Sequence, residues 1–165
     1  MSESREKSFL VVATPDPIEL GQEFRKIPFH MTVIGWFSFP DHRRTFLDHA
    51  MSNIFHDPTL FERAKGGKKV MFGPENDIPA RKILNIDDAP WIALHALIKT
   101  MGKFPPEDKF SDVFSPHITD TDNRKVGWHE KVAFSSVALF AKTAVDPIKY
   151  VEDAYQLKPK GKLSD

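Results

Sequence analysis

One tripeptide pattern, His-x-Thr, occurs twice in this chain, and both copies lie in segments predicted to be strands. The first copy is His30-Met31-Thr32 and the second is His117-Ile118-Thr119, each shortly after a proline. Residues two positions apart in a strand point to the same side of the sheet. Each copy therefore presents an imidazole and a hydroxyl on one face and an apolar side chain on the other. The fold has to accommodate two such strands, one from each half of the chain.

Strand-like and helix-like segments alternate along the rest of the sequence. Apolar residues at one-turn spacing predict two amphipathic helices, one opened by Pro40-Asp41 and one running from Asp88 to Gly102. A short helix is expected over residues 18–26. Gly66-Gly67 predicts a hairpin turn between two strands. Clusters of β-branched and aromatic residues predict strands over residues 8–14, 29–39, 61–65, 68–72, 78–86, 113–119, 131–142 and 148–157.

This order of elements predicts an α+β fold with helices packed on antiparallel sheet. With 165 residues, of which 41% are hydrophobic, the chain has the size and apolar content of one compact domain rather than of a disordered protein. We place a single domain at residues 8–157. The polar residues 1–7 and the basic residues 158–165 are expected to be flexible termini.

Charge and composition exclude several classes of function. The chain has 23 Lys and Arg against 23 Asp and Glu, whereas a protein that grips long duplex nucleic acid usually carries a basic excess. It has no cysteine, which excludes disulfides, thiolate nucleophiles and cysteine-based zinc sites. The first apolar run, residues 9–13, is too short for a secretory leader or a membrane span. We therefore expect a cytoplasmic protein with no membrane partner.

The repeated tripeptides contain the groups that phosphodiester chemistry requires. An imidazole with a pKa near 6.5 acts as acid or base near neutral pH, so two histidines in opposite protonation states supply both roles. Hydroxyls on stiff β-branched side chains can donate hydrogen bonds to phosphoryl oxygens. We take His30, Thr32, His117 and Thr119 as candidate catalytic residues that need no metal and no cofactor. The alternative is that each histidine is a partly buried strand residue satisfied by a neighbouring hydroxyl.

With these motifs the chain resembles the 2H phosphoesterase superfamily, which includes proteins named RNA 2′,3′-cyclic phosphodiesterase or 2′-5′ RNA ligase. The resemblance runs from Phe9 to about Leu157 and includes the Phe-Gly-Pro run at 72–74 and the pattern of 132–142 followed by 150–157. It implies a bilobal fold of two antiparallel sheets flanked by helices, with pseudo-twofold symmetry. It also implies hydrolysis of 2′,3′-cyclic phosphates or 2′-5′ linkages in RNA or small nucleotides, with reverse 2′-5′ ligation as a further reaction.

One position departs from the family pattern. An apolar residue usually follows each motif, as Val33 does after the first, but Asp120 follows the second. Two other functions fit the same residues: cleavage of cyclic-oligonucleotide signals, and non-catalytic binding of nucleotides or RNA ends. In each case we expect a monomer whose partner is an RNA end or a small nucleotide.

Aromatic and basic residues near the motifs are candidates for substrate binding. Phe29 and Phe114 adjoin the two motifs as possible walls of a base pocket, although core packing fits them equally well. Arg124, Lys125 and Trp128 follow the second motif, where a cation can pair with phosphate and an indole can stack on a base. The alternative for these three is an ordinary polar loop with the indole in the core.

Overall fold

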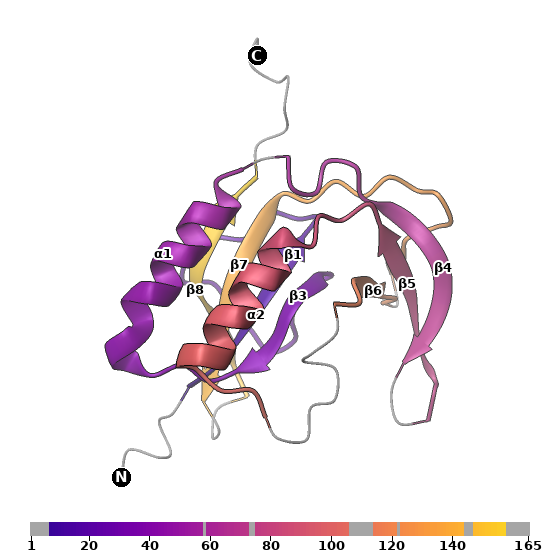
Figure 1. The fold of residues 1–165 in the computed structure, drawn as a ribbon. Coiled ribbons are helices and arrows are strands. Elements are labelled where there is room, and N and C mark those ends of the chain that lie inside the picture. The colour runs from indigo at the N-terminus through magenta and orange to yellow at the C-terminus, as the bar shows by residue number, and fades with distance from the viewer. Residues whose placement is uncertain are drawn as a thin grey trace.

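The computed structural model describes residues 7–57, 59–72, 75–105, 114–121, 123–143 and 147–157. Within these ranges the chain forms eight strands, two α-helices and one short 3₁₀ helix (Figure 1). They follow one another as β1 (Lys7–Thr14), β2 (Glu23–Phe24), β3 (Met31–Phe37), η2 (Asp41–Arg43), α1 (Arg44–Phe55), β4 (Lys65–Phe72), β5 (Ile78–Leu84), α2 (Ala89–Met101), β6 (His117–Thr119), β7 (Ser136–Thr143) and β8 (Lys149–Gln156).

The described strands form one antiparallel sheet in the order β2-β8-β7-β1-β3-β6-β5-β4. The α+β class is confirmed, but the expectation of two separate sheets is wrong. One part of the sheet comprises β2, β8, β7, β1 and β3, and the other comprises β6, β5 and β4. A single residue pair between β3 and β6 joins the two parts, because β6 is only three residues long. Figure 1 shows β4, β5 and β6 set apart from the other strands beyond this join.

Both helices cover the same face of the sheet (Figure 1), and the main core lies between them and β1, β3 and β7. β1 is buried on both faces: Phe9 and Val11 belong to the main core, whereas Leu10 and Val12 belong to a smaller cluster on the opposite face. Ile18 and Ile27, from the chain between β1 and β3, pack into that smaller cluster. Burial on both faces explains why β1 is apolar throughout instead of alternating.

The two long helices form where the apolar spacing predicts them. Leu47, Met51 and Phe55 of α1 are buried, as are Leu94 and Ile98 of α2. Phe46, which shares the apolar spacing of α1, is not buried but 54% exposed. Across the described residues, neither helix is long and apolar enough to cross a membrane.

The expected helix over residues 18–26 is wrong, because this segment is held by β8. Gly21 has a φ of 86°, outside the helical range, and its N–H donates to the carbonyl of Val151. Glu23 and Phe24 then pair with β8 as strand β2. Hydrogen bonds to a distant strand therefore override the local helical preference.

The expected hairpin turn at Gly66-Gly67 is also wrong, as is the expected strand over 61–65. Both glycines are buried inside β4, and the chain returns as β5 only after Phe72. A Cβ atom on Gly66 would lie 2.1 Å from the carbonyl oxygen of Gly127, and one on Gly67 would lie 2.9 Å from Leu84 Cγ. Glycine is needed at these two positions because the Gly127 carbonyl and the Leu84 side chain leave no room for a Cβ atom, and not because the backbone turns there.

The remaining strands are found with shifted ends. β1 begins at Lys7, which was expected in the flexible terminus, and β7 begins only at Ser136. β6 covers the last three residues of the strand expected over 113–119. The rest of the two expected termini, 1–6 and 158–165, and residues 73–74 of the Phe-Gly-Pro run lie outside the described residues.

Candidate active site

The two His-x-Thr tripeptides lie side by side at the join of the sheet. Their middle residues, Met31 and Ile118, pair across β3 and β6. Since these strands are antiparallel, the register places the first histidine beside the second threonine and the second histidine beside the first threonine. Met31 and Ile118 are fully buried in the main core under the helices. The two imidazoles and two hydroxyls therefore belong to the opposite face, which neither α-helix of the described residues covers.

Each histidine is held by the main chain in the same way. His30 Nδ1 lies 2.7 Å from the carbonyl oxygen of Pro28, and His117 Nδ1 lies 2.8 Å from that of Ser115. Because a carbonyl oxygen can only accept, Nδ1 carries the hydrogen in both rings. In both neutral rings Nε2 therefore has the lone pair, which is the state a general base needs.

The surroundings of the two imidazoles favour their neutral forms. Burial lowers the pKa of His30, the carbonyl of Pro28 opposes this change, and the nearby charge of His117 lowers the pKa further. Burial likewise lowers the pKa of His117, against the effect of the Ser115 carbonyl. The two rings interact electrostatically, so a proton on one disfavours a proton on the other. The pair is suited to carry one proton rather than two.

A cavity of about 690 Å³ opens beside the motifs on the helix-free face. His30, Thr32 and Thr119 line it. His117 is not one of its lining residues, and its ring stacks on Phe72, with ring centroids 3.9 Å apart and planes inclined by 19°. The structure thus brings the four predicted catalytic residues to one region, with three of them on the cavity wall.

Asp120 also lines this cavity. β6 ends at Thr119, and the N–H of Asp120 donates to the carbonyl of Pro79 on β5. The carboxylate therefore occupies the position just past the strand end, where no apolar contact is required. This accounts for the departure from the family pattern.

The predicted substrate-binding residues are only partly brought to the cavity. Phe29 lines it, and the guanidinium of Arg124 lies over the Phe29 ring at 4.6 Å from the centroid. Phe114 is not among the lining residues and stacks on Trp91 of α2. Lys125 and Trp128 do not line the cavity either. Trp128 is 58% exposed, so the alternative that placed it in the core is wrong.

Several residues that line the cavity were missed by sequence reasoning, among them the cations and the indole: Arg25, Lys26, Trp36, Lys142 and Lys149. The ammonium of Lys142 lies 4.2 Å from the centroid of the Trp36 ring, and that of Lys149 donates to the carbonyl of Arg25 over 2.6 Å. These residues come from β3, β7, β8 and the segment before β3. Only Trp36, on the same strand as the first motif, had a local signal that could have found it.

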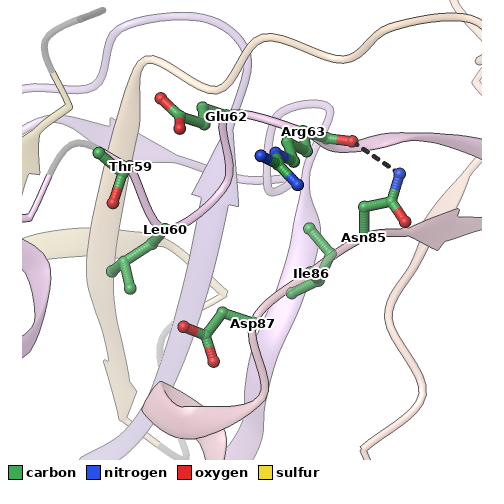
Figure 2. A pocket seen from close by; sticks show the side chains of 7 residues that line it. All are labelled: Thr59, Leu60, Glu62, Arg63, Asn85, Ile86 and Asp87. Carbon is green, nitrogen blue, oxygen red and sulfur yellow. Dashed lines mark hydrogen bonds between the residues drawn. The ribbon is translucent and has the colours of Figure 1, made fainter.

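A second cavity of about 480 Å³ lies elsewhere on the molecule (Figure 2). It is lined by Thr59, Leu60, Glu62, Arg63, Asn85, Ile86 and Asp87. The Asn85 side-chain amide donates to the carbonyl of Arg63 across it, the dashed line in Figure 2. No residue of the two motifs lines this cavity. Among the residues that the structure describes, no three His, Cys, Asp or Glu side chains are grouped so as to hold a metal ion.

No protein-family model matches the chain, and no curated protein matches it significantly. A solved structure described as a crystal structure of phosphoesterase does match. The match has a TM-score of 0.54 and 13% sequence identity, and covers 93% of this chain and 99% of that chain. Identity at this level establishes the likeness of the folds and leaves the reaction to be argued from the site. The chain therefore shares the fold of that structure.

Proposed function

We propose that this protein is a metal-independent phosphodiesterase of the 2H type, in which His30 and His117 transfer protons and Thr32 and Thr119 hold the phosphoryl oxygens. The observation that supports this most is the pairing of the two motifs through Met31 and Ile118. It unites groups that are far apart in the sequence on the face with the cavity. A purely structural role for two strand histidines does not require that juxtaposition.

The substrate proposed is a 2′,3′-cyclic phosphate or a 2′-5′ linkage in RNA or a small nucleotide. One histidine accepts a proton from water through Nε2 while the water oxygen bonds to phosphorus. The bond from phosphorus to one ribose oxygen breaks, and the other histidine donates its proton to that oxygen. A cyclic phosphate thus becomes a phosphomonoester and a free hydroxyl. With a ribose 5′-hydroxyl in place of water, the same steps form a 2′-5′ linkage: the 5′-oxygen gives its proton to one histidine and bonds to phosphorus, while the bond to the 3′-oxygen breaks and that oxygen takes a proton from the other histidine.

The antiparallel register of β3 and β6 suits a mechanism in which one histidine is the base and the other is the acid. A pair of antiparallel strands has local twofold symmetry about its central residue pair, here Met31 and Ile118. We propose that this symmetry extends to the two halves of a bilobal domain, with one histidine on either side of the phosphorus. The two threonine hydroxyls would then flank the phosphoryl oxygens, where donors already in position stabilise developing charge.

The proton needed by the acid comes with substrate binding. In the free protein both pKa values are lowered, which favours two neutral rings. An anionic phosphate next to them raises the pKa of the nearer imidazole and so stabilises one imidazolium. Binding therefore prepares the pair for catalysis, with one neutral base and one protonated acid.

Alanine substitution of either histidine tests the proposal. His30→Ala and His117→Ala are each expected to lower kcat on a 2′,3′-cyclic mononucleotide by about 10²–10⁴, the usual contribution of one acid or base. The double variant should lose less than the product of the two losses, because the histidines act as a unit. Steady-state kinetics measures this, and circular dichroism confirms that the variants fold.

His49→Ala is the matched control, since His49 is an exposed histidine on α1. It should retain full activity. A folded His30→Ala or His117→Ala variant with activity near that of the wild type would overturn the assigned role. Tight binding of the cyclic nucleotide without turnover by the wild type would identify a nucleotide-binding module instead of an enzyme.

A further inference from the structure

The cavity beside the two motifs is strongly cationic, although the chain as a whole has a formal net charge of zero. Four of its lining side chains are cations, Arg25, Lys26, Lys142 and Lys149, and Asp120 is the one carboxylate among the lining residues. Within the described part of the chain, none of the four cations forms an ion pair with a carboxylate. Their charge is therefore available to an anionic ligand in the cavity.

The two lysines are positioned rather than merely exposed. Lys142 on β7 is half-buried and lies over the ring of Trp36. Lys149 on β8 is half-buried as well, and its ammonium is held by the carbonyl of Arg25. The register of β7 and β8, in which Ala141 pairs with Tyr150, places the two lysines next to each other. Two neighbouring ammonium groups without a carboxylate form a site suited to phosphate.

This pair of lysines is too far from the motifs to act on the phosphate that reacts. Trp36, under Lys142, follows Thr32 by four positions on β3. At about 3.3 Å per residue this separation is roughly 13 Å along the strand, well beyond the span of one phosphate group. A ligand that touches both the motifs and the lysines therefore carries a second anionic group.

We infer that the protein acts on oligonucleotides, and that Lys142 and Lys149 bind a second phosphate of the substrate next to Trp36. This inference rests on the proposed phosphodiesterase function and names its substrate class. The strand would run from the histidines across β1 toward β8, with the Trp36 ring as an apolar surface for a base. A mononucleotide would fill only the part of the cavity near the motifs.

The test compares two substrates in a variant without the lysine charges, Lys142→Gln/Lys149→Gln. The substrates are a 2′,3′-cyclic mononucleotide and a trinucleotide that ends in a 2′,3′-cyclic phosphate. The loss in kcat/KM on the trinucleotide should exceed the loss on the mononucleotide by at least about tenfold, the range of two charge-assisted hydrogen bonds. The slope of log kcat/KM against log salt concentration on the trinucleotide should become shallower by about 0.7 for each phosphate that the lysines no longer neutralise.

Two further variants separate charge at this site from general effects. Lys142→Arg/Lys149→Arg keeps the charge and should retain the preference for the trinucleotide. Lys99→Gln/Lys103→Gln removes the same charge from exposed positions on and just after α2. This control should leave kcat/KM unchanged on both the mononucleotide and the trinucleotide. Thermal melting checks that every variant is folded.

The outcomes distinguish this inference from the function on which it rests. If the wild type is active on both substrates and the glutamine variant loses kcat/KM equally on both, the second phosphate site is refuted. The proposed phosphodiesterase function would still stand. A wild type that hydrolyses neither substrate would overturn the proposed function. The site is then tested by fluorescence polarisation with a labelled trinucleotide, where weaker binding by the glutamine variant supports it and equal binding refutes it.

Discussion

Main-chain carbonyl groups set the tautomer of both imidazoles. In each case the carbonyl two residues earlier accepts the Nδ1 hydrogen, from Pro28 for His30 and from Ser115 for His117. No acidic side chain is therefore needed to set the tautomer of either ring. The repeated geometry follows from the repeated local sequence, a histidine entering a strand just after a proline.

The lowered histidine pKa values predict the pH dependence of the reaction. Proton donation requires an imidazolium, whose population in the free protein is lost as pH rises through pKa values below the ordinary 6.5. A profile of kcat/KM should therefore be bell-shaped with its optimum below about pH 6.5, and its limbs belong to the coupled pair. The optimum of kcat should lie higher, because bound phosphate raises the pKa of the acid.

Initial rates between pH 4.5 and 9 measure both profiles. A kcat/KM that increases steadily to pH 9 would contradict the requirement for a protonated histidine. A bell in kcat/KM centred well above pH 7 would contradict the effect of burial on the two rings.

At the scale of elements, α1 is tied to β8 by a charged cluster. Arg44 at the start of α1 contacts Glu152 on β8 over 2.6 Å, and Lys7 on β1 contacts the other oxygen of Glu152 over 2.8 Å. The Glu152 side chain is only 13% exposed. Burial alone would raise its pKa, but the hydrogen bonds from Lys7 and Arg44 outweigh burial, and the pKa is lowered overall. Ionised Glu152 therefore stabilises the docking of the helix.

Glu152→Gln is expected to lower the free energy of unfolding at pH 7 by about 1–3 kcal/mol, the cost of losing hydrogen bonds between charged groups. Because the folded-state pKa is lowered, this stabilisation is present above the ordinary glutamate pKa of about 4.5 and is lost as pH falls through the folded value. Urea unfolding at pH 7 and in acid measures the difference. Asp48→Asn is the control: Asp48 pairs with Arg44 but is 45% exposed, so its loss should cost less than about 1 kcal/mol. Equal effects of the two substitutions would contradict the bridging role of Glu152.

The close approach inside β4 gives a second prediction about an element. Gly66→Ala would place a methyl group against the main-chain oxygen of Gly127, which cannot move as a side chain can. We expect a loss of about 1–3 kcal/mol or more in the free energy of unfolding, as for an overpacked core. In Gly127→Ala the new methyl would meet the flexible carboxylate of Glu130 at 3.2 Å, so this variant should be far less affected. Equal thermal melting of the two variants would show that the strand tolerates the methyl group.

For the whole molecule, the distribution of charge matters more than its sum. A chain with a formal charge of zero collects four cations and a single carboxylate on the wall of the cavity beside the motifs. Such a wall attracts phosphate and repels divalent metal ions. In the proposed mechanism the two histidines would supply the acid and the base, and the two threonines would supply the electrostatic stabilisation that metal ions give in metal-dependent phosphodiesterases.

Hydrolysis is accordingly expected to persist in excess EDTA. Turnover of the cyclic mononucleotide with and without the chelator should agree within experimental error. Activity that EDTA abolishes, and that Mg²⁺ or Mn²⁺ restores, would contradict the two-histidine mechanism.

Local periodicity in the amino-acid sequence is enough to predict the helices, most of the strands and the candidate catalytic residues. The apolar spacing predicts α1 and α2, the β-branched clusters predict most of the strands, and the His-x-Thr repeats predict four candidate catalytic residues. These features follow from interactions between residues that are close in the chain. Such interactions require apolar residues one helical turn apart in a helix or two residues apart in a strand, so they are visible in the sequence.

The way in which these elements pair and pack depends on contacts between distant parts of the chain. The pairing of Met31 with Ile118, the strand character of Glu23–Phe24 and the close approach at Gly66 each depend on a partner far away in the chain. The cationic wall likewise combines residues from several strands and from the segment before β3. The local pattern of residues does not indicate which distant backbone or charged side chain will lie beside a given strand. Packing of the whole sheet determines those neighbours.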